Sequence, residues 1–120
     1  MHPPISYQLS IDVTRPVLIR VGRLGEFLFP AGRYVYTGSA RRNLEARIAR
    51  HLRTEKALRW HIDWLLMAPG VAVARVERSI ESECALNRKV GGAVPVPGFG
   101  ASDCRNGCGS HLRYLGPGGR

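Results

Sequence analysis

Apolar and polar residues alternate near the start of the chain with the period of two that is typical of a half-buried strand. Apolar side chains stand at 7, 9, 11 and 13, and Arg15-Pro16 ends the pattern. Short apolar runs at 17–21, 26–29 and 33–37 predict three further strands, with a turn over Gly22 to Gly25 between the first two. Strands joined by such short turns pair antiparallel, so a mainly antiparallel sheet is expected.

The period changes to that of a helix after residue 42. Leu44, Ile48 and Leu52 recur four residues apart behind Asn43, a good N-cap residue, which predicts a helix over about 43–53. A second helix is predicted over 57–67, followed by a strand marked by Val71, Val73 and Val76. A third helix is expected to be capped by Ser79, to carry Glu81 and Glu83 in its first turn and to end at Gly91-Gly92. The chain then continues as an ordered loop over 94–109 and a strand over 111–115.

The length of 120 residues allows one domain with a single core. The pattern therefore predicts one α+β domain over residues 1–120, in which a mainly antiparallel sheet is flanked by about three helices. Residues 116–120 are expected to form a frayed tail.

The charge balance is the first indication of a partner. The chain has 18 basic and 9 acidic residues, a net charge of +9, and sixteen of the basic residues are arginine. The planar guanidinium group suits phosphate, so nucleic acid is the expected partner. An arginine-rich composition can also follow from genome base content. Charge alone does not tell whether a nucleic acid is cut or only bound.

The ends and hydropathy of the chain bear on its location. No apolar run approaches the roughly 18–20 residues that a membrane span needs. The start, Met1-His2-Pro3-Pro4, has neither the basic region nor the apolar stretch of a signal peptide. A cytoplasmic protein with reduced cysteines is therefore expected.

The residues best suited to chemistry lie where the fourth predicted strand leads into the first helix. Tyr36 is expected at the strand end, with Gly38 turning the chain towards the helix. Arg47 and His51 are one helical turn apart at the edge of the apolar stripe, where a side chain is held firmly yet reaches solvent. Arginine can neutralise charge on a phosphate, and tyrosine or histidine can transfer a proton, so this group is a candidate phosphodiester site.

These residues carry a resemblance to a known family. Tyr36-Thr37-Gly38-Ser39-Ala40 followed by Leu44-x-x-Arg47-x-x-x-His51 resembles the second half of the GIY-YIG nuclease motif, shared by some homing endonucleases and the amino-terminal nuclease of the bacterial excision-repair incision subunit. The chain is more similar to the Uri-type branch of this superfamily. The further segments that carry this likeness are Tyr34 to Ala40, Arg47 to His51, Trp60 to Asp63, Glu83-Cys84 and Ser102 to Leu112. The likeness covers nearly the whole chain and is specific only as a set.

The resemblance implies a role for each matching residue. Tyr36 matches the tyrosine of the YIG element and Tyr7 that of the GIY element, although here Ile5-Ser6-Tyr7 lacks the glycine. Arg47 matches the arginine at the scissile phosphate and His51 the accompanying histidine. Glu83 matches the single carboxylate that binds Mg²⁺ or Mn²⁺.

The implied reaction is hydrolysis of a phosphodiester bond in one displacement step. The metal on Glu83 supplies positive charge, Arg47 contacts the nonbridging oxygens, and either Tyr7 or Tyr36, helped by His51, deprotonates water. The sequence does not assign the base between the two tyrosines. Basic side chains near the motif are candidate substrate contacts: Arg41, Arg42, Arg50, Lys56 and His61.

Each of these residues also has an ordinary structural interpretation. Tyrosine on a strand is usually part of the core, and a glutamate near a helix start often only favours the helix dipole. Trp60 and Trp64, four residues apart, are expected in the core before they are expected to stack on bases.

The cysteines suggest a second kind of site. Cys104-x₃-Cys108-x₂-His111 has a spacing close to half of a structural zinc site, and Cys84 could be a fourth ligand. The spacing matches no standard zinc pattern, however. Cys84 would also have to point away from its neighbour Glu83, which consecutive positions on a helix permit. Cysteines in glycine-rich loops are often simply small buried residues. We therefore expect no zinc, and keep a zinc site as the alternative.

The sequence thus favours a metal-dependent endonuclease that acts on DNA. The alternatives are a nucleic-acid-binding module of the same fold without turnover and a zinc-stabilised protein-interaction domain.

Overall fold

The computed structural model describes residues 2–40, 42–101, 104 and 107–117. These residues form a four-stranded antiparallel sheet in the order β5-β1-β4-β6 and a separate two-stranded hairpin, β2-β3. The strands are β1 (Ser6–Val13), β2 (Val17–Val21), β3 (Gly25–Phe29), β4 (Gly32–Ser39), β5 (Val71–Ser79) and β6 (Leu112–Tyr114). The helices are α1 (Leu44–Leu52), α2 (His61–Leu66) and α3 (Glu83–Val90), with a single 3₁₀ turn, η1 (Gly22–Leu24), inside the hairpin. The α+β class and the antiparallel sheet expected from the sequence are confirmed.

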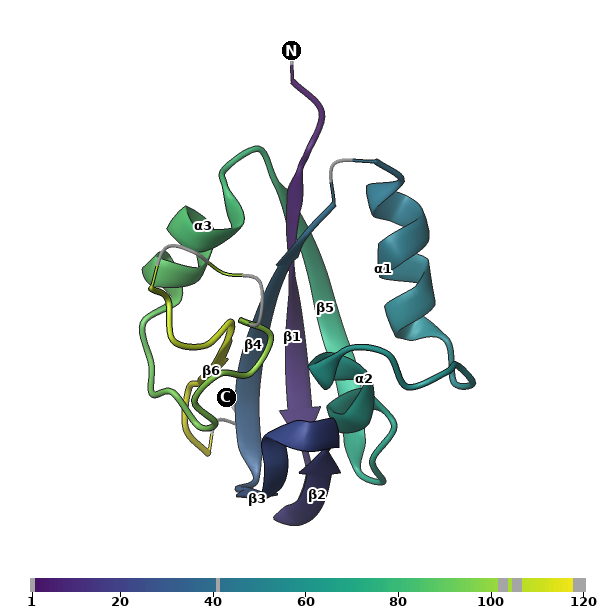
Figure 1. The fold of residues 1–120 in the computed structure, drawn as a ribbon, viewed down its shortest axis with the longest axis vertical. Helices are drawn as coiled ribbons and strands as arrows, with labels where there is room; N and C mark the ends of the chain where they lie inside the picture. The colour runs from purple at the N-terminus through teal and green to yellow at the C-terminus, as the bar shows by residue number, and fades with distance from the viewer. Residues whose placement is uncertain (1, 41, 102–103, 105–106, 118–120) are drawn as a thin grey trace.

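The helices stand on both sides of the sheet in Figure 1, with α1 and α2 to the right and α3 and the C-terminal segment to the left. One face of β1 carries Tyr7, Leu9, Ile11 and Val13 into the core, as their period of two predicts. Side chains from α1, α2, the hairpin and the loop before β6 add to this core; they include Phe29, Leu44, Ile48, Ile62, Leu65 and Phe99. No helix in the described part of the chain is long and apolar enough to cross a membrane.

Strand β5 keeps its apolar side chains on the sheet through a bulge. Val71 and Val73 follow a period of two, but the next valine is Val76, one position beyond the expected 75. The pairing with β1 shifts between Ser10 and Ile11, which leaves Ala74 unpaired. The extra residue returns Val76 to the side of the core, opposite Leu9.

Two helices begin later than their sequence patterns predict. α2 begins at His61 instead of Ala57, because the carboxylate of Asp63 accepts the backbone N–H groups of Arg59 and Trp60 and holds Trp60 extended. α3 begins at Glu83 behind Ser82, whose hydroxyl accepts the N–H of Ala85.

Ser79 is the last residue of β5, so Glu81 precedes α3 instead of lying in its first turn. The predicted end of α3 at Gly91 is confirmed. The predicted start of a helix behind Asn43 is confirmed as well, and this helix is α1. Asn43 occupies the N-cap position in a left-handed conformation, without a side-chain capping bond. Of the predicted tail over 116–120, residues 118–120 lie outside the described part.

Gly38 has a role other than the expected turn. It lies inside β4 directly opposite Tyr7, and Tyr36 is likewise inside the strand, opposite Leu9. A Cβ atom at position 38 would stand 2.5 Å from the Cζ and hydroxyl oxygen of Tyr7. The absence of a side chain at this position therefore makes room for the Tyr7 ring.

Replacing Gly38 by alanine tests this close approach. The backbone of Gly38 is not in the left-handed region, so the cost is steric and not conformational. We expect Gly38→Ala to lower the free energy of unfolding by about 1–3 kcal/mol, the usual penalty for overpacking. Urea denaturation measures it; a midpoint equal to that of the unaltered protein would contradict the pairing of Tyr7 with Gly38.

Candidate functional site

A hollow of about 440 Å³ opens between α1, the sheet, α3 and the loop before β6. Its lining includes four of the five residues expected to be catalytic: Tyr7, Tyr36, Arg47 and Glu83. The fifth, His51, lies behind Tyr7. Trp60, His61 and His111 also lie along its wall. Residues far apart in the sequence are thus brought to one cavity.

Tyr7 and His51 form a buried hydrogen-bonded pair. The Tyr7 hydroxyl and the Nε2 atom of His51 are 2.6 Å apart, and only 2% of His51 is exposed. The expectation that His51 reaches solvent is therefore wrong; its contact with the hollow runs through Tyr7. Its Nδ1 atom has no hydrogen-bond partner among the described residues.

Burial sets the protonation states of this pair. It lowers the pKa of His51 to about 4, so the imidazole is neutral at pH 7 and can accept the tyrosine proton. Burial also raises the pKa of Tyr7 well above its usual range, while the guanidinium group of Arg47 acts in the opposite direction. Tyr36, whose ring centre is 6.5 Å from that of Tyr7, has its pKa raised by burial in the same way.

Ser39 connects the two charged groups of the hollow. Its carbonyl oxygen accepts from Nη1 of Arg47 at 3.0 Å, and its hydroxyl donates to Oε1 of Glu83 at 3.1 Å. The guanidinium of Arg47 also lies 4.7 Å from the ring centre of Trp60. Because Ser39 ends β4, the sheet fixes the positions of the cation on α1 and of the carboxylate on α3.

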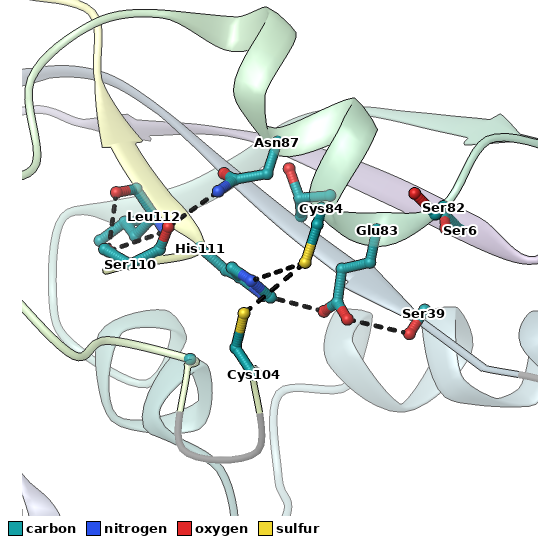
Figure 2. A network of polar contacts seen from close by, with 12 residues as sticks. Ser6, Ser39, Ser82, Glu83, Cys84, Asn87, Cys104, Ser110, His111 and Leu112 are labelled. Carbon is teal, nitrogen blue, oxygen red and sulfur yellow. Dashed lines mark hydrogen bonds and ion pairs between the residues drawn. The ribbon is translucent and has the colours of Figure 1, made fainter. Parts of the chain in front are cut away.

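His111 joins the carboxylate to the cysteines, as Figure 2 shows. Its Nδ1 atom is 3.0 Å from Oε2 of Glu83, and its Nε2 atom is 4.0 Å from the sulfur of Cys84. The hydrogen bond to Glu83 raises the pKa of His111 to about 9. Glu83 and Cys84, although adjacent in sequence, therefore meet opposite edges of one imidazole ring.

The four zinc candidates also converge. The ligand atoms of Cys84, Cys104, Cys108 and His111 all lie within 4.8 Å of one another, so this group could hold a metal ion. All three cysteines are among the described residues, and none is in a disulfide. The irregular spacing therefore does not keep these residues apart, because the fold brings the four ligand atoms together.

The candidate substrate contacts occupy different positions. Arg42 is exposed, and Arg41 lies outside the described residues. Arg50 donates both terminal nitrogens to the buried Asp63, at 2.9 and 3.0 Å, so this guanidinium is a structural partner. Lys56 donates to the backbone carbonyl of His51, next to the same ion pair.

His61 is placed on the wall of the hollow. Its Nδ1 atom accepts the backbone N–H of Gly100 at 2.9 Å, so Nε2 carries the proton of the neutral ring. Burial lowers the pKa of His61, which favours that neutral form. His61 is therefore a fixed hydrogen-bond donor.

Three residues of the site were not assigned roles from the sequence. Ser39 links Arg47 to Glu83, Arg59 lines the hollow, and Asp63 anchors Arg50. Asp63 is a carboxylate among apolar residues on a helix, and such a carboxylate in the core requires a basic partner. The sequence therefore indicated that Asp63 needs a basic partner, but it did not identify Arg50 as that partner.

The sequence model of the family "Domain of unknown function DUF123" matches residues 6–118, so the chain belongs to this family. No curated protein and no solved structure among those compared with the chain matches it. The match spans β1 to β6 and therefore all residues of the hollow.

The His51 environment predicts a dependence of stability on pH. The pKa of an unfolded histidine is near 6.5, and that of folded His51 is about 4. Between these values the unfolded chain binds a proton at His51 and the folded protein does not, which favours unfolding. The stabilisation is complete above 6.5 and is lost as pH falls to 4. We expect this to remove about 3 kcal/mol of unfolding free energy.

The variant His51→Gln lacks this titration and serves as the control. Its unfolding free energy, measured in urea at several pH values, should fall less steeply between pH 6.5 and 4 than that of the unaltered protein. Parallel curves would show that His51 is not held neutral.

Proposed function

We propose that the chain is a divalent-metal-dependent endonuclease of the GIY-YIG type that hydrolyses phosphodiester bonds in DNA. The observation that carries the proposal is the convergence of a hydrogen-bonded tyrosine–histidine pair, an arginine and a carboxylate on one hollow. These groups come from β1, α1 and α3, and a general base, a phosphate contact and a metal ligand are the parts that such hydrolysis needs.

Glu83 fits the requirements of a Mg²⁺ or Mn²⁺ ligand. It is the one carboxylate on the wall of the hollow among the described residues, and 28% of its side chain is exposed. Mg²⁺ in nucleotide and nucleic-acid sites commonly takes one or two protein carboxylates and completes its shell with phosphate oxygens and water. When bound, it supplies charge stabilisation to the phosphate and the leaving oxygen.

We assign the base to Tyr7. Its hydroxyl proton has a defined destination in Nε2 of the neutral His51, 2.6 Å away, so the phenol oxygen can take a proton from water while its own passes to the imidazole. Among the described residues, the hydroxyl of Tyr36 forms no hydrogen bond with a histidine. Tyr36 instead packs against Phe99 and Tyr7 and lines the hollow next to the base.

Arg47 is assigned to the phosphate. It is half-buried, and its Nη1 atom is fixed on the carbonyl of Ser39. The remaining N–H groups of the guanidinium can donate to nonbridging oxygens as negative charge develops in the transition state. Arg59 lines the same hollow and, with Arg47, makes its mouth attractive to a nucleic-acid backbone.

Glu83 and Arg47 separate an enzyme from a module that only binds. Glu83→Gln should reduce cleavage about 100- to 1,000-fold, because metal charge stabilisation contributes several kcal/mol to lowering the barrier. Binding of DNA should persist, since one negative charge has left a site that faces phosphate. Arg47→Ala should abolish cleavage and weaken binding. Labelled single-stranded, duplex and branched DNA with Mg²⁺ or Mn²⁺, and an EDTA control, provide the measurement.

Glu81→Gln is the matched control. Glu81 precedes α3 and pairs with Lys89 on the surface, so its loss should leave cleavage unchanged. Cleavage at the unaltered rate by Glu83→Gln would reject the metal-ligand role. Binding without cleavage by the unaltered protein, under every metal condition, would favour the binding module.

Binding itself should depend strongly on salt. The net charge of +9 implies that bound cations are released from the nucleic acid when the protein binds. The logarithm of the association constant should fall with the logarithm of salt concentration by about 0.9 per phosphate contacted in duplex and about 0.7 in single-stranded DNA. Fluorescence anisotropy across a salt series measures this slope; a slope near zero would reject the polyanion partner.

A further inference from the structure

We propose that Cys84, Cys104, Cys108 and His111 bind one structural Zn²⁺ and that this site orients Glu83 through the second nitrogen of His111. Zinc binding is independent of the nuclease activity. The effect on Glu83 rests on the proposed function, because that function makes Glu83 the ligand of the catalytic metal.

The donor atoms have the dimensions of a tetrahedral zinc site. With Zn–S bonds of about 2.3 Å and Zn–N bonds of about 2.0–2.1 Å, neighbouring ligand atoms stand about 3.8 Å (S to S) and about 3.6 Å (S to N) apart. The sulfur of Cys84 is 3.6 Å from that of Cys104 and 4.0 Å from Nε2 of His111. All four atoms lie within 4.8 Å of one another. A small inward movement therefore completes the tetrahedron.

The composition of the set selects the metal. Three thiolates and one imidazole suit zinc, whereas Mg²⁺ and Mn²⁺ prefer oxygen. Four protein ligands close the shell, and a closed shell is typical of a structural site and not of a catalytic one. A disulfide within the cluster would leave one of the three thiols over, so metal binding uses the set more completely.

The position of the ligands in the chain explains what the metal would stabilise. Cys84 is on α3, and His111 is fixed by backbone hydrogen bonds to Phe99 and Thr37. Cys104 and Cys108 belong to the loop that joins α3 to β6, outside any helix or strand. Binding all four would tie this loop to the helix, and the free energy of metal binding would become folding free energy.

The link to the hollow is the imidazole ring of His111. Its Nε2 atom faces the cysteines and its Nδ1 atom is 3.0 Å from Oε2 of Glu83, as Figure 2 shows. A histidine that binds zinc through one nitrogen commonly donates its other N–H to a carboxylate, which fixes both groups. Glu83 then receives this N–H on one oxygen and the Ser39 hydroxyl on the other. His111 is thus a positioning residue for the carboxylate.

The first test measures zinc directly. Protein purified without a metal-binding tag should contain about one zinc per chain by elemental analysis. Titration of metal-free protein with Co²⁺ should give the thiolate charge-transfer and tetrahedral d–d absorption bands of a cobalt–thiolate site. Cys104→Ser and Cys108→Ser should each lose the stoichiometric metal. Zinc-free protein whose Co²⁺ titration shows no thiolate band would overturn the site, and this result does not require the variants to fold.

The second test measures the coupling to Glu83. If Glu83 holds the zinc-binding histidine, Glu83→Gln should keep one zinc but weaken its affinity about 10- to 100-fold against a competing chelator, the usual effect of changing such a partner. Glu81→Gln should leave the affinity unchanged. Equal zinc affinities in Glu83→Gln and the unaltered protein would overturn the positioning role while leaving the zinc site intact.

Failure of the two proposals can be told apart. One zinc per chain with no cleavage of any nucleic acid would reject the nuclease and leave the zinc site. Metal-dependent cleavage by a protein that contains no zinc and gives no cobalt–thiolate band would reject the zinc site and leave the nuclease.

Discussion

The buried carboxylate of Asp63 holds α1 and the segment before α2 together. It is fully buried and accepts both terminal nitrogens of Arg50 and the backbone N–H groups of Arg59 and Trp60. Burial alone would raise its pKa, but these hydrogen bonds outweigh burial and lower it, so Asp63 is charged. A buried charge left without such partners costs several kcal/mol, so α1 and the segment before α2 are bound to one another.

This ion pair decides which arginines remain to contact the proposed nucleic-acid substrate. The side chain of Arg50 is only 15% exposed, and its guanidinium group is paired with Asp63. Trp60, held extended by the same carboxylate, presents its ring to Arg47 and Arg50 at 4.7 and 4.3 Å. Arg47 and Arg59 therefore keep their place at the hollow, and their orientation depends on Asp63, which is not among the residues that line it.

Local periodicity predicted the parts of the fold that depend on neighbours in sequence. The strand over β1 and the helix over α1 follow from apolar spacing alone, and so does the hairpin around Gly22 to Gly25. The start of α3 could not be predicted in this way, because Ser79 and Ser82 are equally good caps. Pairing of Ser79 with Ser6 in the sheet excludes the first choice.

The candidate site shows the same division. The resemblance to known nucleases named Tyr7, Tyr36, Arg47 and Glu83, and the fold places all four on one hollow. The resemblance could not show that His111 contacts Glu83, 28 positions away in the chain. Nothing in the spacing of these residues links the helix to a distant loop. Adjacent residues on a helix were expected to point apart. Glu83 and Cys84 do point apart, yet the imidazole ring of His111 contacts both, one through each of its nitrogens.

Glu83 also acts through space on Tyr7, the proposed base, and the sign of this effect separates two roles for the carboxylate. Its negative charge raises the pKa of Tyr7, against the effect of Arg47. If Glu83 were only a neighbour of the base, its neutralisation would make Tyr7 more acidic and would not hinder proton transfer. A carboxylate that binds a metal has the opposite consequence, because losing it removes a larger positive charge from the same hollow. A loss of cleavage when Glu83 is neutralised would therefore support metal binding by Glu83. It could not be attributed to the direct effect of the Glu83 charge on the pKa of Tyr7.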